Sequence, residues 1–517
     1  MTPILTFDTR LDRPRRLIAL AASGSIAIAS VPAIIAFPGS AWLAALFCTL
    51  AGGLVPLVIL RGRSAFRILI GLFLALGFWA KFVAHFAIGT ALIEPIGQFS
   101  GTPDAWNAAL GTASAGLAGV GTALLATAPL KPTASTPTLV DPSGILKRFG
   151  IAVLVASLVA AFVIFAFNFR FAILKIGFVP TLALHPYLYV LVAFAVSWGI
   201  ALWLLVLTWW LIETGRLPPS SLIYLGAAEG AVAALSMGSR VQMILHVLAA
   251  TLAFWQGTRY RGWRISRSSC AKLVLAVGLL FGAALLAVSL DRAYSFTGAV
   301  PDVTPAAAPA SSTSQPPAAP NAGTPAAPAT AAAAATRDDD VQREQRIREK
   351  IRSIPNEISR LFVMRWVGLE GVLTTVGADD RLGPDLLHRG LLEQPSAGVD
   401  ALYQRMSEAT YQRFSNFVFM TIPGPLAVAH YGGSLILCFL LLATLVLLGT
   451  FIEYATDRLT GNPAAASLTG VALSYLIVQM NFPRTLFFFV LELVGAVLIL
   501  ACIRLLLNND WRFSGFR

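Results

Sequence analysis

Two apolar stretches meet in Ala233–Ala250, AALSMGSRVQMILHVLAA, with only the four residues Met237–Arg240 (MGSR) joining them. Together with the residues that flank them, both stretches have the length and the apolar character of helices. The sequence therefore predicts a helical hairpin that crosses a membrane and turns back at MGSR. Arg240 lies at the tip of this hairpin with almost no loop around it, so its role needs an explanation.

The composition places the whole chain in the same class as this hairpin. Of its 517 residues, 56% are hydrophobic and 12% are charged, whereas soluble domains carry about 25% charged residues. The mean hydropathy is +0.73. The four cysteines are scattered and have neither metal-ligand nor redox spacing. We therefore expect an all-α, polytopic membrane protein, with no metal and no cofactor predicted.

Apolar runs of about 18 residues or more are expected to span the bilayer as helices. The first run, Leu17–Phe37, is too long for the core of a cleaved signal peptide, so we interpret it as an uncleaved span. The sequence contains twelve such runs: 17–37, 41–60, 68–92, 108–130, 149–169, 187–212, 220–238, 241–257, 273–290, 432–452, 465–481 and 485–507.

The net charge of +12 is interpreted as an orientation signal, since basic residues concentrate in cytoplasmic loops. If the N-terminus is cytoplasmic, the C-terminus and the basic connecting loops are also inside, and no nucleic-acid partner is expected. The basic residues on that side are Arg10, Arg13, Arg15, Arg16, Arg61, Arg63, Arg67, Lys131, Lys147, Arg148, Arg259, Arg261, Arg264, Arg267, Lys272, Arg512 and Arg517.

One long connection interrupts the pattern of short loops and divides the chain into four parts. Residues 1–290 would hold spans one to nine, and residues 432–517 would hold spans ten to twelve with the tail. Residues 291–340 are rich in Ala and Pro and are typical of a disordered tether. Residues 341–431 predict amphipathic helices on or near the outer surface of the membrane.

Ionisable residues inside spans are informative, because a charge in hydrocarbon costs several kcal/mol unless it is paired or lines a watery cavity. Lys81 lies near the middle of the third run, and His85 follows four residues later on the same helix face. Arg170, Arg240 and Arg484 lie at outer ends of spans. With Lys81 they would border one outer cavity that suits an anionic ligand such as a lipid pyrophosphate.

The long loop adds further candidates in SRLFVMRWVGLEGV, where Arg360, Arg365 and Glu370 lie in an apolar helix. A carboxylate beside cations in a low-dielectric site can accept a proton, so Glu370 is a candidate general base. His388 and His430 are the other possible bases of the loop.

These features resemble the Wzy-type O-antigen and exopolysaccharide polymerases and the related O-antigen ligases. The resemblance rests on the MGSR turn, the twelve spans, the large late loop, and the segments RWVGLEG and TIPGPLAVAHYGGSLIL. The Arg-x10-Gly spacing of Arg360 and Gly371 is similar to one described for some Wzy loops.

The resemblance implies an enzyme of the bacterial inner membrane with a periplasmic loop, which joins undecaprenyl-pyrophosphate-linked oligosaccharides into a surface polysaccharide. Arg240 would bind the pyrophosphate with Arg360, Arg365 or Arg484, Lys81 would neutralise the lipid phosphate, and Glu370 or His388 would be the base. The substrate-binding set is Lys81, His85, Arg170, Arg240, Arg360, Arg365 and Arg484. The implied partners are the lipid-linked glycans, membrane lipids, and chain-length regulator and flippase proteins.

Two alternatives stay open. A ligase-type glycan transferase differs from a polymerase only in its acceptor, which the sequence does not reveal. A twelve-helix secondary transporter is expected to have two similar halves, but here the longest loop follows the ninth span and no repeat of the first half is visible.

Overall fold

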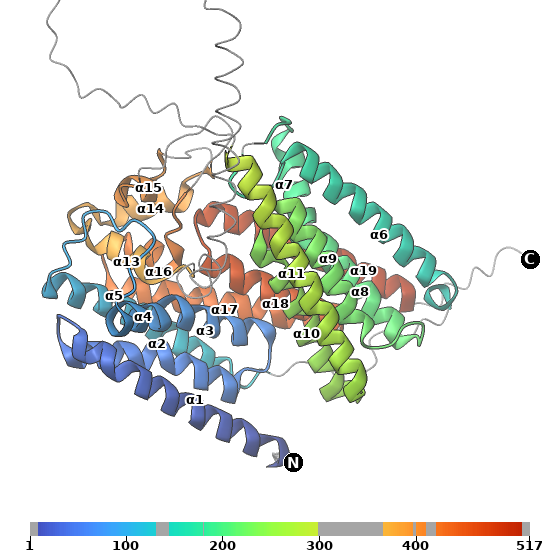
Figure 1. Cartoon of the computed structure of the whole chain (residues 1–517), viewed down its shortest axis with the longest axis horizontal. Coiled ribbons are helices and arrows are strands. Elements are labelled where there is room, and N and C mark those ends of the chain that lie inside the picture. The colour runs from blue at the N-terminus through green and yellow to red at the C-terminus, as the bar shows by residue number, and fades with distance from the viewer. Residues whose placement is uncertain are drawn as a thin grey trace, which may run out of the picture.

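The computed structural model describes residues 9–130, 144–178, 180–297, 366–395, 400–409 and 420–508. Every regular element in these ranges is a helix (Figure 1). The all-α class predicted from the composition is therefore confirmed for the described part of the chain.

The elements follow one another as α1 (Thr9–Ala36), α2 (Ala41–Arg61), α3 (Ala65–Ala75), η1 (Leu76–Ala80), α4 (Lys81–Ile88), α5 (Pro103–Ala126), α6 (Ile145–Phe171), α7 (Pro186–Phe194), η2 (Ala195–Gly199), α8 (Ile200–Glu213), α9 (Ser221–Met237), α10 (Arg240–Arg261), α11 (Arg267–Thr297), α13 (Leu369–Val376), η3 (Asp379–Arg381), α14 (Pro384–Leu392), α15 (Leu402–Met406), α16 (Gly424–His430), α17 (Leu435–Thr460), α18 (Pro463–Val478) and α19 (Pro483–Asn508).

Nine helices of the described residues are long and apolar enough to cross a membrane, so the chain is a polytopic membrane protein. These nine lie on nine of the twelve predicted runs. The other three runs coincide with α9, α10 and α18. Helices α9 and α18 have only 17 and 16 residues, and α10 is longer but more polar. The number of twelve spans stays a prediction.

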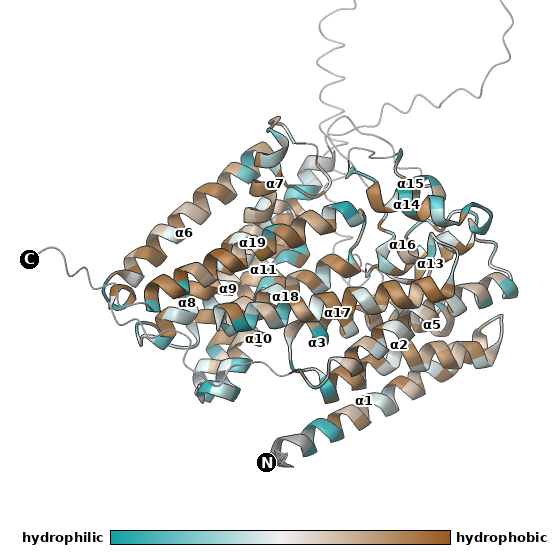
Figure 2. Ribbon diagram, turned by 180° about the vertical axis from the view of Figure 1, so that it is seen from behind, coloured by the Kyte–Doolittle hydropathy of each residue, from teal (hydrophilic) through white to brown (hydrophobic). Residues whose placement is uncertain are grey.

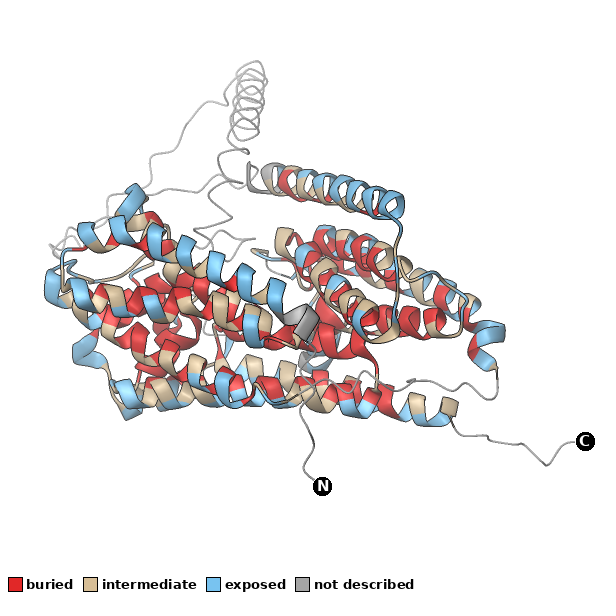
Figure 3. Cartoon of the chain, turned by 90° about the horizontal axis from the view of Figure 1, so that it is seen from below, coloured by how far each residue is buried: buried red, intermediate tan, exposed pale blue. Residues whose placement is uncertain are grey.

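The most buried helices lie at the centre of the bundle. Helix α18 packs against α3, α10, α17 and α8, and almost all of its residues are buried. Peripheral helices such as α1, α6 and α11 bury only about a fifth or less of their most apolar window, and they show long exposed faces (Figure 3). Their exposed side chains include large apolar ones such as Leu20, Val159 and Leu275, and α6 is largely brown in Figure 2, as expected of helices whose outer surface meets lipid.

Two of the long helices contain a short π-helical segment, η1 before α4 and η2 between α7 and α8. A π-helical turn changes the backbone hydrogen-bond ladder from i→i+4 to i→i+5 and is frequent at functional sites. The first segment ends directly before Lys81, and the second contains Ser197 and Trp198.

The long loop between α11 and α17 differs from the predicted surface helices where it is described. Every residue of Leu369–Thr375 in α13 is buried, and Leu369, Val372 and Leu373 belong to the main hydrophobic core. This segment is not an amphipathic helix with an exposed face, because α5 and α16 both pack against it, and its position on or near the outer surface of the membrane stays a prediction. The predicted tether at 291–340 is wrong at its start, because α11 continues to Thr297. Residues 298–365, which include Arg360 and Arg365, lie outside the described residues.

Candidate functional site

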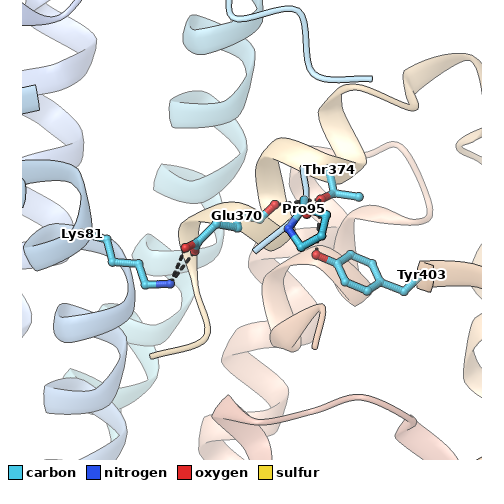
Figure 4. A network of polar contacts seen from close by, with 5 residues as sticks. All are labelled: Lys81, Pro95, Glu370, Thr374 and Tyr403. Atoms are coloured by element: carbon cyan, nitrogen blue, oxygen red, sulfur yellow. Dashed lines mark hydrogen bonds and ion pairs between the residues drawn. The ribbon is translucent and has the colours of Figure 1, made fainter. Parts of the chain in front are cut away.

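Lys81 and Glu370 form an ion pair between a membrane helix and the long loop. The Lys81 ammonium donates to both carboxylate oxygens of Glu370, each at 2.6 Å, and both side chains are buried (Figure 4). Hydrogen bonding to both oxygens satisfies the charge that burial would otherwise leave uncompensated. The structure thus joins directly two residues that the sequence analysis treated as separate members of one site.

Close backbone packing brings Glu370 to Lys81. Gly77 in η1 lies against the carbonyl group of Val367, so that a Cβ on Gly77 would collide with the Val367 oxygen. Trp366 stacks on Phe73, with 4.9 Å between the ring centroids. The segment Trp366–Gly371 therefore docks on the π-helical turn that directly precedes Lys81.

A second set of polar contacts fixes α13 on the other side of Glu370 (Figure 4). The Thr374 hydroxyl donates to the Glu370 carbonyl at 3.0 Å and lies 3.3 Å from the Tyr403 hydroxyl. It also lies 3.4 Å from the Pro95 carbonyl. Lys81 of α4 binds the Glu370 carboxylate, and Pro95 and Tyr403 contact Thr374 one turn further along α13. This part of the loop is therefore firmly anchored in the bundle.

His430 at the end of α16 lies against the same helix. Its Nδ1 is 3.1 Å from the Thr375 hydroxyl. Burial lowers the pKa of His430 from its ordinary value of 6.5, and the negative charge of Asp379 offsets part of this effect. The neutral imidazole is therefore the form that the folded loop favours.

The MGSR turn is held by residues from two other segments of the chain. Gly238 adopts the left-handed conformation with φ +60°, which favours glycine. The Ile176 amide donates to the Met237 carbonyl at 2.8 Å, and Arg292 Nε donates to the Gly238 carbonyl at 3.0 Å. These contacts pack the turn between the segment after α6 and the end of α11.

Three basic residues surround this turn. Arg240 is the first residue of α10, and Arg292 binds the turn itself. A Cβ on Gly238 would lie 3.5 Å from the Lys175 side chain, and Lys175 pairs with Asp291 at 2.8 Å. Since Asp291 offsets the charge of Lys175, Arg240 and Arg292 are the two cations at the turn that Asp291 does not pair with in these contacts.

The other predicted site residues lie elsewhere. His85 contacts Phe86 and Trp106 and lies 2.9 Å from the Thr90 carbonyl. Arg170 and Arg484 are exposed and lie over Phe171 and Phe488 of their own helices. His388 is exposed on α14. The structure does not bring Arg170, Arg484 or His388 to Lys81.

A further buried pair was missed by the sequence analysis. His246 Nδ1 lies 2.5 Å from Glu229 Oε2, and both residues are buried between α9 and α10. Both lie inside predicted spans, so the rule that singled out Lys81 also applied to them. The signal was therefore present in the sequence.

Among the described residues, no three His, Cys, Asp or Glu side chains are placed to hold a metal ion. Comparisons with protein-family models, with curated proteins and with solved structures find no match for this chain.

Proposed function

We propose that this membrane protein is a glycosyltransferase of the bacterial inner membrane that polymerises undecaprenyl-pyrophosphate-linked repeat units at the outer face. In this proposal twelve helices span the membrane, and both termini are cytoplasmic. The observation that carries the proposal is the basic MGSR turn, where Lys175, Arg240 and Arg292 come from three different segments.

The reaction would proceed at this turn by substitution at a sugar carbon. A hydroxyl group of the acceptor glycan attacks the anomeric carbon of the donor, the bond from that carbon to the pyrophosphate oxygen breaks, and the hydroxyl proton passes to a base. The leaving pyrophosphate gains negative charge as the bond breaks. Fixed cations stabilise that charge in the transition state, and guanidinium groups pair bidentately with phosphate oxygens.

The part of the loop that anchors to Lys81 supports a site with a protein cover. Figure 1 shows α14 and α15 on the same side of the molecule as the end of α11 that carries Asp291 and Arg292. Glu370 and His388 stay the proposed bases. Glu370 would have to release the Lys81 ammonium before it could accept a proton, because both of its oxygens are engaged.

Arg240 offers the sharpest test, with Arg259 near the other end of α10 as a matched control. In a strain without the chromosomal gene, we expect single repeat units to accumulate and long chains to be lost. R240A should lower polymer formation by about 10²-fold, the magnitude typical of one lost transition-state donor. R240K should retain part of the activity, because lysine keeps the charge but not the bidentate geometry.

R259A should support normal chain length at an equal amount of membrane-inserted protein. Full activity of R240A would contradict the phosphate-binding role, and normal chains in the deletion strain would contradict a polymerase altogether. A ligase would instead leave long lipid-linked chains that are not transferred to their final acceptor.

A secondary transporter is the second candidate function. The observation in its favour is the buried His246–Glu229 pair inside a membrane hairpin, since ionisable residues within spans often mark ion or proton pathways. Transport of a solute by the purified protein in proteoliposomes, without a lipid-linked glycan, would favour this alternative.

A further inference from the structure

We propose that His246 and Glu229 form a buried proton-binding site in the hairpin of α9 and α10, and that the proton is taken up and released at His246 Nε2. This proposal does not depend on the function proposed above. It rests on the contacts of the two ring nitrogens and on the unusual backbone beside them.

Small residues bring the two helices close enough for the pair to form. Gly226 and Gly230 are four residues apart on α9, a spacing that lets helix backbones approach in membranes. A Cβ on Gly226 would lie 2.7 Å from the Ala250 Cβ, and one on Gly230 would lie 3.1 Å from the His246 Cβ. Larger residues at these positions would push α10, and with it His246, away from Glu229.

The surroundings of His246 Nε2 contain a hydrogen-bond acceptor and a hydrogen-bond donor at the same time. The Ser197 carbonyl oxygen lies 3.0 Å from Nε2, and Gln242 Nε2 lies 2.8 Å from it. Gln242 Nε2 also donates to the Ser197 carbonyl. This contact fixes the amide orientation, because the opposite orientation would place two acceptor oxygens against each other.

Both protonation states of the imidazole therefore have a partner for Nε2. In the loaded state, Nδ1–H donates to Glu229 and Nε2–H donates to the Ser197 carbonyl, and the Gln242 amide, itself a donor 2.8 Å from Nε2, has to turn away. When the proton leaves Nε2, its lone pair can accept from the Gln242 amide, while Nδ1–H stays on Glu229. One proton is exchanged, and the Gln242 side chain turns with it.

Glu229 supplies the negative charge that compensates the imidazolium, and one of its oxygens accepts no hydrogen bond. Its Oε2 binds His246, whereas its Oε1 is buried and has no hydrogen-bond partner in the described part of the chain. Ser197 belongs to the π-helical segment η2, where the altered backbone ladder presents a carbonyl group to a side chain of another helix. An oxygen without a partner and a redirected carbonyl group are unusual for a purely structural ion pair.

The site is isolated from other titratable groups in the helices that pack around it. Helix α18 has no charged residue, and its Tyr475 lies beyond Trp198, whose ring is 5.7 Å from that of His246. Helices α6, α8 and α11 carry their charged residues only toward their ends. Glu229 is thus the one charged group facing His246 among the described residues, so the pair should titrate as a unit.

Nitrogen NMR of the histidine rings can test the proposal on the full chain in lipid nanodiscs. The chain has five histidines, so ¹⁵N-histidine labelling gives few signals, and H246Q identifies those of His246. H185Q is the matched control, because His185 is exposed at the start of α7. If H246Q does not fold, a variant that keeps His246 and replaces the other four histidines provides the same identification.

We expect His246 to show two protonated ring nitrogens in acid and one, Nδ1, in alkali, within about pH 5 to 9. E229Q should lose the doubly protonated signal, while H185Q should leave the His246 signals unchanged. A His246 spectrum that stays the same across this range in the folded protein would overturn the proposal, and so would a doubly protonated signal that survives unchanged in E229Q.

Discussion

The buried carboxylates of Glu370 and Glu229 each bind a basic side chain next to a π-helical turn, but the number of carboxylate oxygens engaged differs. Lys81 follows η1 directly and engages both oxygens of Glu370. His246 lies against Ser197 of η2 and engages only one oxygen of Glu229. The first pair is fully satisfied, whereas the second leaves an oxygen open and gives Nε2 two alternative partners.

The difference indicates that the two pairs have different roles. The Lys81–Glu370 pair joins residues 289 positions apart in the chain and so holds the long loop in the membrane bundle. The His246–Glu229 pair joins residues only 17 positions apart in one hairpin, where the turn and the small residues already hold the helices together. A fixed charge pair suits an anchor, whereas an imidazole that has a partner for Nε2 in both protonation states suits exchange of a proton.

Removing each carboxylate charge should produce the largest effect and compare the two pairs directly. E370Q leaves a lysine buried without a counter-charge, and we expect a loss of about 3–5 kcal/mol in the free energy of unfolding. E229Q leaves a histidine that can stay neutral, so no unpaired charge is buried and we expect only about 1–3 kcal/mol. Thermal unfolding in detergent at pH 7 measures both.

The double variant K81M/E370M is the control for E370Q, since removing both charges should restore much of the stability. Equal losses for E370Q and E229Q would contradict the distinction between an anchor and an exchangeable site.

Gly77→Ala should weaken the anchor without touching either charge. The new methyl group would collide with the Val367 carbonyl group, and overpacking of this kind costs about 1–3 kcal/mol. We expect a lower unfolding temperature and faster proteolysis of the long loop. Gly53→Ala on α2 is the matched control, because a Cβ there meets no atom within 4 Å. Similar behaviour of the two variants would show that the loop does not depend on this contact.

The smallest expected effect is a pH-dependent change in the stability of the protein that comes from His430, next to the anchored loop. Burial lowers the pKa of His430 below 6.5, so the unfolded chain binds more protons than the folded one as the pH falls below that value. The stability contributed by this residue is therefore present above about pH 6.5 and is lost in more acidic solution. Unfolding temperatures of wild type and H430Q should converge as the pH is lowered, and a constant difference would contradict this origin.

Much of the fold could be predicted because it depends on local properties. Apolar runs such as Leu17–Phe37 and Ala41–Leu60 can satisfy their backbone groups in lipid only as helices, and each of the twelve runs is helical. The segment at Leu369–Thr375 is predicted to be an amphipathic helix on or near the membrane surface. Its burial depends on α5 and α16, and a single segment does not reveal its neighbours.

The candidate site was predicted only in part for the same reason. The cost of a buried charge identifies Lys81, and its place beside cations in an apolar helix identifies Glu370, but neither argument reveals that the two residues are partners. Lys175 and Arg292 lie near the ends of predicted spans, where charges are common, and only the tertiary structure shows that they lie around MGSR.

The sequence by itself determined the helical class, the positions of the apolar runs and the presence of an arginine in a tight turn, because these follow from composition and local periodicity. The tertiary structure alone decided which charges meet. It placed Glu370 on Lys81 by packing Gly77 against Val367, and it placed His246 between Glu229 and Ser197 by the close approach of α9 and α10. Such pairings depend on distances of a few ångströms between segments far apart in the chain, which no local pattern encodes.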